Sequence, residues 1–259
     1  MKRFGSDRGT MPFLMLLPNL LTVLGLCAGL TSVRFTLAER YEIAAVLIIF
    51  AALIDGIDGR LARRLQASSE FGAELDSLAD FLNFGVAPAL LVFQHTMSDA
   101  AGFGWTFALV YACCCCFRLA RFNVSRESAT DAEVMAGRRH FVGVPAPAGA
   151  MLALLPLFLT FAGVIDSAAH PVTASLYLGL VGLAMVSRVP TLSPKAILVP
   201  REHVLWVLIA VAAVTGLMLT RFWWAMILLD LIYSGSLVHS AHRAFRDRHR
   251  KGPPGRSGA

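Results

Sequence analysis

Long apolar segments separated by short polar turns run along most of this chain. Two of them are IAAVLIIFAAL at 43–53 and FGVAPALLVF at 84–93. An α-helix needs roughly 20 apolar residues to cross the hydrocarbon core of a bilayer, which is about 30 Å thick. The pattern therefore predicts about eight membrane-spanning helices, at 19–38, 43–62, 71–94, 104–122, 144–165, 172–186, 204–219 and 222–239.

The composition supports a membrane protein. Hydrophobic residues make up 56% of the chain and charged residues 15%, and the mean hydropathy is +0.64. Soluble domains are typically about 45–50% apolar and about 25% charged. We therefore expect an all-α, polytopic membrane helix bundle, with residues 1–242 as a single integral membrane domain and residues 243–259 as a disordered, basic cytoplasmic tail. No small-residue cleavage site follows the first apolar run, so a cleaved signal peptide is not expected.

The basic residues predict the orientation of these spans. With eight alternating helices, all but three of the 23 Lys and Arg residues fall on one side, and the exceptions are Arg34, Arg40 and Arg221. Because cytoplasmic loops carry the excess of Lys and Arg, both termini should face the cytoplasm, in a plasma membrane of the bacterial inner-membrane type. For the basic tail we expect lipid headgroups rather than nucleic acid as the partner.

Four aspartates lie at the ends of two of the predicted helices. Asp55 and Asp58 are three residues apart, and Asp76 and Asp80 are four apart. Both spacings place a pair of side chains on one helical face. A short basic turn around 63–69 joins the two helices, so their cytoplasmic ends should be neighbours. The two acidic faces should therefore converge near the membrane surface.

Four carboxylates brought together in this way repel one another strongly. A divalent cation relieves the repulsion, and ligation by oxygen alone suits Mg²⁺ or Mn²⁺ better than softer metals. Arg63 follows on the same helix, where a guanidinium could hold phosphate beside the metal. One alternative is a solvated helix tip in which the acids only pair with Arg60, Arg63 and Arg64. Another is a divalent-cation transporter, although transport sites usually lie near the bilayer midplane rather than at helix ends.

The aspartates also belong to a longer pattern with fixed spacing. It reads DxxDGxxAR, eight residues, Gly, three residues, Asp, three residues, Asp, and it is matched without departure by Asp55, Asp58, Gly59, Ala62, Arg63, Gly72, Asp76 and Asp80. In this pattern the chain resembles the CDP-alcohol phosphatidyltransferases, and the resemblance implies the fold of that family. The motif covers only residues 55–80, but the predicted topology agrees with the family over the whole chain.

The resemblance implies a catalytic site. In the family, the four aspartates bind a pair of divalent ions and the fourth is also the general base. This implies two Mg²⁺ or Mn²⁺ ions held by Asp55, Asp58, Asp76 and Asp80, with Asp80 as the base. The implied contacts to CDP-diacylglycerol are Gly59, Ala62, Arg63, Ser69, Gly72 and, from the segment PNLLT in the first span, Asn19 and Thr22.

Three further stretches resemble one branch of the family, the membrane-embedded phosphatidylserine synthases. They are LADFLNFGVAPA from Leu78, FRLARFNV from Phe117 and FVGVPAPAGA from Phe141. The branch commonly has a small polar residue where Leu82 or Asn83 falls, so the first stretch departs from its pattern at this point.

The branch implies transfer of the phosphatidyl group of CDP-diacylglycerol to the hydroxyl of L-serine, which gives phosphatidylserine and CMP. Membrane lipids are the expected surroundings, and a homodimer is left open. L-Serine carries a carboxylate, so Arg118 and Arg121 are candidate serine contacts at the cytoplasmic end of the fourth span, or else ordinary positive-inside anchors. The alternative is the same transfer to another alcohol, such as glycerol 3-phosphate or inositol.

Overall fold

The computed structural model describes residues 13–65, 69–97, 101–127, 143–187 and 204–250, and within these ranges the regular structure is helical, without strands. It forms eight rods: α1 (Phe13–Leu37), α2 (Tyr41–Leu65), a composite rod, α5 (Ala101–Glu127), α7 (Ala146–Phe161), α8 (Pro171–Val186), α9 (Val204–Thr220) and α10 (Phe222–Arg250). The composite rod joins α3 (Glu70–Asp80), the π-helix η1 (Phe81–Val86), α4 (Ala87–Val92) and the π-helix η2 (Phe93–Met97). Each rod coincides with one predicted span, which confirms the all-α class and the predicted number of helices.

Four of these rods contain a stretch that is long and apolar enough to cross a membrane. The stretches are Leu16–Leu37, Glu70–Met97, Gly102–Ser125 and Phe222–Ser240. Three shorter apolar helices accompany them, at Ala146–Phe161, Pro171–Val186 and Ile209–Thr220. Large apolar side chains are exposed on each of these rods except α7, and exposed apolar surface is compatible with lipid as the surrounding solvent. The helices thus support the prediction of an integral membrane protein.

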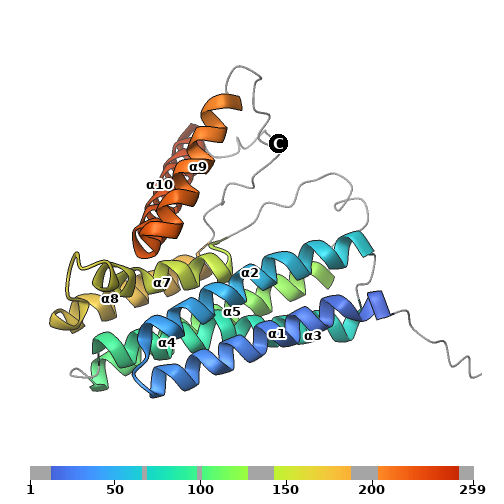
Figure 1. The fold of residues 1–259 in the computed structure, drawn as a ribbon, viewed down its shortest axis with the longest axis horizontal. Helices are drawn as coiled ribbons and strands as arrows, with labels where there is room; N and C mark the ends of the chain where they lie inside the picture. The colour runs from blue at the N-terminus through green and yellow to red at the C-terminus, as the bar shows by residue number, and fades with distance from the viewer. Residues whose placement is uncertain (1–12, 66–68, 98–100, 128–142, 188–203, 251–259) are drawn as a thin grey trace, which may run out of the picture.

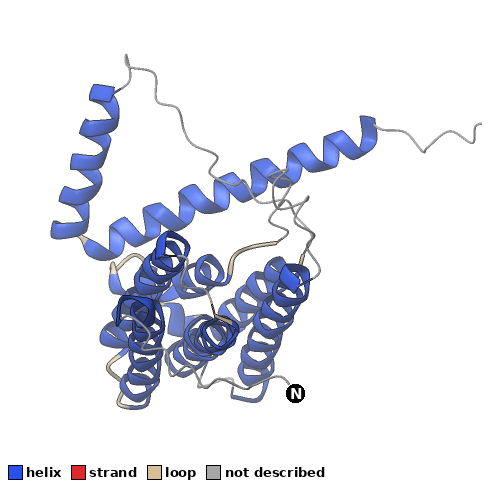
Figure 2. Cartoon of the chain, turned by 90° about the vertical axis from the view of Figure 1, so that its right-hand side faces the viewer, coloured by secondary structure: helices blue, strands red, loops and turns tan. Residues whose placement is uncertain are grey.

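The rods fall into two groups. The six from α1 to α8 run side by side in Figure 1 and are seen nearly end-on in Figure 2, so they form one bundle. α9 and α10 cross the axis of this bundle and lean away from it. α10 continues to Arg250, so the predicted boundary at residue 242 falls inside a helix, and only residues 251–259 of the predicted tail lie outside the described residues. The helix can run on because the chain has no glycine or proline between Gly235 and Gly252.

Small residues allow the bundle helices to approach closely. A Cβ atom added to Gly182 of α8 would lie 3.0 Å from the Cα of Tyr111 on α5, and one added to Gly179 would lie 2.5 Å from the ring of Phe107. On the other side of the bundle, the buried Ser32 hydroxyl of α1 donates to the Ala44 carbonyl of α2 at 2.8 Å. Close approach of this kind is the usual basis of helix association in membranes, where burying apolar surface gives little gain.

Two prolines free carbonyl groups inside the bundle, and two tyrosines satisfy them. Pro88 has no N–H to donate to the Phe84 carbonyl, and the buried Tyr111 hydroxyl donates to that carbonyl at 2.8 Å. Pro156 leaves the Leu152 carbonyl in the same position, and Tyr177 donates to it at 2.8 Å. These bonds fix α5 against the composite rod and α8 against α7.

Candidate active site

Three of the four predicted aspartates come together where α2 meets the composite rod. Asp55, Asp76 and Asp80 each offer one carboxylate oxygen, and these oxygens all lie within 4.8 Å of one another. Asp55 comes from α2, whereas Asp76 and Asp80 lie one turn apart on α3. The predicted convergence of the two acidic faces is therefore present. At this spacing three ionised carboxylates repel one another, and either a positive charge or a proton shared between two carboxyls offsets the repulsion.

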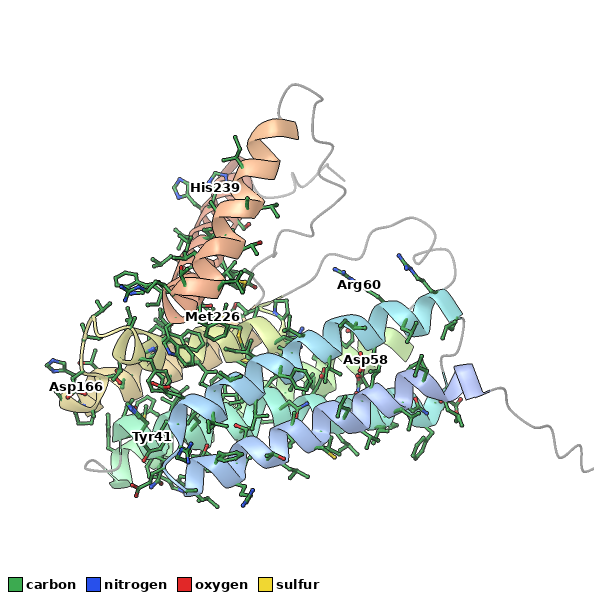
Figure 3. The ribbon with its side chains drawn as sticks, viewed as in Figure 1. Tyr41, Asp58, Arg60, Asp166, Met226 and His239 are labelled. Atoms are coloured by element: carbon green, nitrogen blue, oxygen red, sulfur yellow. The ribbon has the colours of Figure 1, made fainter. Side chains whose placement is uncertain are left out.

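Asp58 lies beside this group and has a partner on α1. It is 4% exposed, and the Thr22 hydroxyl lies 3.2 Å from its Oδ2 and 3.1 Å from the Pro18 carbonyl oxygen. In Figure 3 Asp58 points between α1 and α2, whereas Arg60 points away from the bundle. Asp58 therefore lies within electrostatic range of Asp55 and Asp76, and it points away from Arg60 (Figure 3). This does not match the alternative of a solvated tip for the pair of Asp58 and Arg60.

A positive group reaches the aspartates from α5. The Arg118 guanidinium lies within electrostatic range of both Asp55 and Asp80. Its Nε atom is buried and has no hydrogen-bond partner within the described part of the chain. Cys115 lies one turn earlier on α5, within electrostatic range of Asp80 and Arg118. Arg118 therefore combines charge with an unused donor next to the acidic group.

Arg121 lies one turn beyond Arg118 but is engaged elsewhere. Its Nη1 donates to the Val186 carbonyl at the end of α8, at 2.9 Å. On the same part of α5, Asn123 Nδ2 donates to the Ser77 hydroxyl at 2.9 Å, and this hydroxyl belongs to the residue after Asp76. The sequence analysis did not single out Asn123 as a supporting residue, although the stretch FRLARFNV contains it. These two side chains fix the C-terminal half of α5 to α8 and α3.

Three predicted nucleotide contacts meet at the start of α3. The Ser69 hydroxyl accepts a hydrogen bond from the Gly72 backbone N–H at 3.0 Å and so caps the helix. A Cβ atom added to Gly72 would lie only 2.7 Å from Asn19 Oδ1, which reaches over from α1. The absence of a side chain at position 72 therefore lets α1 pack closely on α3. Polar groups from residues far apart in the chain are thereby gathered at one helix N-terminus.

The other predicted contacts lie on α2. Gly59 is half-buried, and among the described residues no atom outside its own stretch of helix lies within 4 Å of the position that its Cβ would occupy, so a ligand could approach the backbone there. Ala62 and Arg63 belong to the helix, but their side chains lie outside the described part of the structure. The predicted contact between Arg63 and phosphate therefore stays a prediction.

Comparisons with known proteins agree with this site. Residues 15–183 match the sequence model of the family described as CDP-alcohol phosphatidyltransferase. Over 236 residues the chain is 40% identical to a CDP-diacylglycerol–serine O-phosphatidyltransferase of Mycobacterium leprae, a match that covers 88% of this chain and 76% of the relative.

Two more relatives carry the same name. One from Mycobacterium tuberculosis is 47% identical over 150 residues, which cover 57% of this chain and 51% of the relative, so this match spans about half of that protein. One from Helicobacter pylori is 33% identical over 182 residues, 68% of this chain and 71% of the relative. These names bear out the resemblance to phosphatidylserine synthases. The chain therefore belongs to the CDP-alcohol phosphatidyltransferase family.

Proposed function

We propose that this protein transfers the phosphatidyl group of CDP-diacylglycerol to the hydroxyl of L-serine and releases CMP. The observation that carries the proposal is the arrangement at the aspartate end of the bundle, where Asp55, Asp76 and Asp80 converge beside the Arg118 guanidinium. The names of the relatives support serine as the acceptor. The alternative is transfer to another alcohol, such as glycerol 3-phosphate or inositol, and the assay described below distinguishes the two.

The aspartates fit the divalent metal that members of this family generally use. Three carboxylate oxygens within 4.8 Å form a hard donor set, which suits Mg²⁺ or Mn²⁺. We assign the ligands of two such ions to Asp55, Asp58, Asp76 and Asp80. When bound, the ions would neutralise charge on the phosphate oxygens and on the leaving CMP.

Asp80 is the residue we assign as general base. It lies at the end of α3, directly before the π-helix η1, and within electrostatic range of Arg118. A π-helical turn interrupts the regular helix and often occurs at functional sites. The serine oxygen forms a bond to the phosphorus that carries the diacylglycerol, and the bond from this phosphorus to the oxygen of CMP breaks. CMP leaves with the electron pair, and the proton of the serine hydroxyl passes to Asp80.

We assign CDP binding to the groups around the start of α3 and on α2. Asn19, Ser69 and Gly72 lie together there, and Gly59 leaves open space for a ligand. Thr22 stands next to them on α1 and lies in contact with Asp58. Ala62 and Arg63 complete the proposed set from the family pattern.

For the acceptor we assign the serine contact to Arg118 rather than to Arg121. Arg118 lies beside Asp55 and Asp80, and its Nε is without a partner in the described ranges. Arg121 already donates to the Val186 carbonyl at the end of α8. Arg118 can therefore reach a substrate carboxylate near the base, whereas Arg121 supports the helix that carries it.

The assay uses purified protein in detergent with CDP-diacylglycerol, Mg²⁺ or Mn²⁺, and a panel of radiolabelled alcohols. Labelled L-serine should be the preferred acceptor, and CMP should appear in equal amount. A preference for glycerol 3-phosphate or inositol would replace serine as the acceptor but keep the reaction class. No transfer to any alcohol would overturn the proposal.

We also propose that the aspartate end faces the cytoplasm, because the excess of basic residues lies on that side. Glu39 lies in the turn before α2, and Glu70 is the first residue of α3, after the turn that follows α2. Both residues are exposed, and α2 separates them. In a cysteine-free background, Glu39→Cys should react with an impermeant thiol reagent added to intact cells, and Glu70→Cys should react only after lysis. The reverse pattern would overturn the orientation.

A further inference from the structure

Tyr233, on α10, differs from the other tyrosines of the chain. Tyr111 and Tyr177 donate to carbonyls freed by prolines, and Tyr41 packs edge-on against the His95 ring, with the ring centroids 4.8 Å apart. The Tyr233 hydroxyl oxygen is buried and has no hydrogen-bond partner among the described residues. A buried hydroxyl without a partner is costly, because it has lost water and gained nothing in exchange. Such a group usually awaits a ligand or a bound water.

The surroundings of Tyr233 indicate which kind of ligand. Its hydroxyl lies within electrostatic range of the Arg118 guanidinium, whose buried Nε also has no partner in the described part of the chain. Two buried hydrogen-bond donors without acceptors in the described ranges therefore lie within electrostatic range of each other, and one of them is charged. Such a pair of donors is complementary to an anion with two oxygens.

The face of α10 that carries Tyr233 holds two further buried polar side chains among its apolar ones. Asp230 lies one turn before Tyr233 and Ser240 two turns after it, so the three side chains share one face. Asp230 Oδ2 and Ser240 Oγ are buried and, like the Tyr233 hydroxyl, lack a hydrogen-bond partner in the described ranges. A face of this kind suits a polar ligand, because lipid tails satisfy none of these groups.

The position of Arg118 indicates that the anion it binds is the carboxylate of the acceptor L-serine and not a phosphate of CDP-diacylglycerol. In L-serine only two carbon atoms separate the carboxylate carbon from the hydroxyl oxygen. A group that holds the carboxylate must therefore lie close to the base that receives the hydroxyl proton. Arg118 meets this condition, because it lies within electrostatic range of Asp80. The residues proposed for CDP, in contrast, gather at the start of α3.

We propose that Tyr233 and Arg118 together hold the carboxylate of L-serine. The inference rests on the proposed function and deepens it, since it identifies a residue that selects the acceptor. α10 begins well after residue 183, where the match to the family model ends. A helix outside the matched region thus contributes to the choice of alcohol, while the matched region carries the aspartates.

The test compares Tyr233→Phe with the control Tyr177→Phe in the full-length protein. Each substitution removes one tyrosine hydroxyl, and the Tyr177 hydroxyl is bonded to the Leu152 backbone carbonyl. For Tyr233→Phe the KM for L-serine should rise by about tenfold or more, as expected for the loss of a hydrogen bond to a charged group. Its KM for CDP-diacylglycerol should stay within about twofold. Tyr177→Phe should leave both KM values within about twofold.

A second measurement uses serinol, in which a hydroxymethyl group replaces the carboxylate of serine. The ratio of kcat/KM for L-serine to that for serinol should fall by about tenfold in Tyr233→Phe and stay unchanged in Tyr177→Phe. This ratio does not depend on how much of a sample is folded, so partial unfolding of a variant does not affect it. An unchanged ratio overturns the inference.

A rise in the KM for CDP-diacylglycerol alone would also overturn the inference, because the hydroxyl would then face a lipid phosphate. Failure of the proposed function has a different signature. In that case the wild-type protein itself would release no CMP with L-serine, whatever the behaviour of the variants.

Discussion

The two ends of the bundle use polar groups in opposite ways. At the end opposite the aspartates, the turn after α7 is held by its own side chains. The Thr160 and Ser167 hydroxyls lie 2.8 Å apart, the Ser167 N–H donates to Thr160 Oγ1, and Asp166 Oδ1 accepts from the Ala168 N–H. These bonds satisfy the short 3₁₀ helix η4 (Ser167–Ala169). Figure 3 places Asp166 and Tyr41 at this end, far from Asp58.

The aspartate end, by contrast, brings together groups that do not satisfy one another. Three carboxylates share a small volume, and Arg118 Nε and the Tyr233 hydroxyl lack partners within the described residues. Crowded like charges and unused donors lower stability unless a ligand completes them. Crowded like charge therefore distinguishes the aspartate end, whereas at the other end the buried His95 Nδ1, beside Tyr41 and Phe161, is the atom that lacks a partner among the described residues. Substitutions should reduce activity at the aspartate end and stability at the other.

The largest expected effect comes from exchanging one acid at each end. Asp80→Asn removes the proposed base and should lower kcat/KM for transfer to L-serine by at least about a hundredfold, the lower end of typical general-base contributions. Asp166→Asn keeps an oxygen that can accept from the Ala168 N–H, and its kcat/KM should stay within about twofold. Equal losses at the two ends, measured by CMP release, would contradict the assigned difference.

A divalent metal should stabilise the protein through the aspartate end. A ligand present at about 100 times its Kd raises the free energy of unfolding by roughly 2.7 kcal/mol. Mg²⁺ or Mn²⁺ should therefore raise the unfolding midpoint in detergent, and chelation should reverse the shift. The same shift should appear in Asp166→Asn and be lost in Asp55→Asn. A full shift in Asp55→Asn would remove Asp55 from the proposed ligands.

Two tyrosine substitutions compare a hydroxyl that has a protein partner with a hydroxyl that has none among the described residues. Tyr177→Phe leaves the Leu152 carbonyl without its donor and should lower the free energy of unfolding by about 1–3 kcal/mol. Tyr233→Phe removes a buried hydroxyl that has no protein partner in the described ranges, so the free energy of unfolding of the unliganded protein should not fall and should rise by up to about 1–3 kcal/mol. Unfolding in detergent, followed by circular dichroism, measures both. A fall in the free energy of unfolding of Tyr233→Phe would mean that the Tyr233 hydroxyl has a structural role.

The smallest effect is expected at the turn itself. Ser167→Ala removes the hydrogen bond between the Ser167 and Thr160 hydroxyls and should cost about 0.5–1.5 kcal/mol of stability. Transfer to L-serine should be unchanged, because this turn lies at the other end of the bundle. A drop in kcat without a drop in stability would show that the two ends are coupled.

Much of the acidic site could be predicted from spacing. Asp55 and Asp58, and then Asp76 and Asp80, share helical faces by their separation in the chain, and the structure brings three of the four together. Arg118 could be proposed because it belongs to the stretch FRLARFNV near the end of a predicted span and because L-serine carries a carboxylate, whereas its place beside Asp55 and Asp80 comes from the structure. Local periodicity settles these points, since a helix fixes the direction of every side chain along it.

Other features depend on neighbours that sequence spacing does not reveal. Asn19 reaches Gly72 only because α1 packs on α3, and Tyr233 approaches Arg118 only because α10 crosses the bundle. The π-helix after Asp80 also has no clear sequence pattern, although Pro88 explains why the Phe84 carbonyl needs Tyr111.

The sequence by itself determined the membrane class, the eight helices and the spacing of the aspartates, because hydrophobicity and helical periodicity are properties of local segments. Only the tertiary structure decided which polar groups have partners. Thr22 and Asp58 contact each other across two helices, Arg121 is bound by the end of α8, and the Tyr233 hydroxyl is left without a partner in the described part of the chain. Partnership depends on helix packing and crossing angles, which arise from contacts between residues far apart in the sequence.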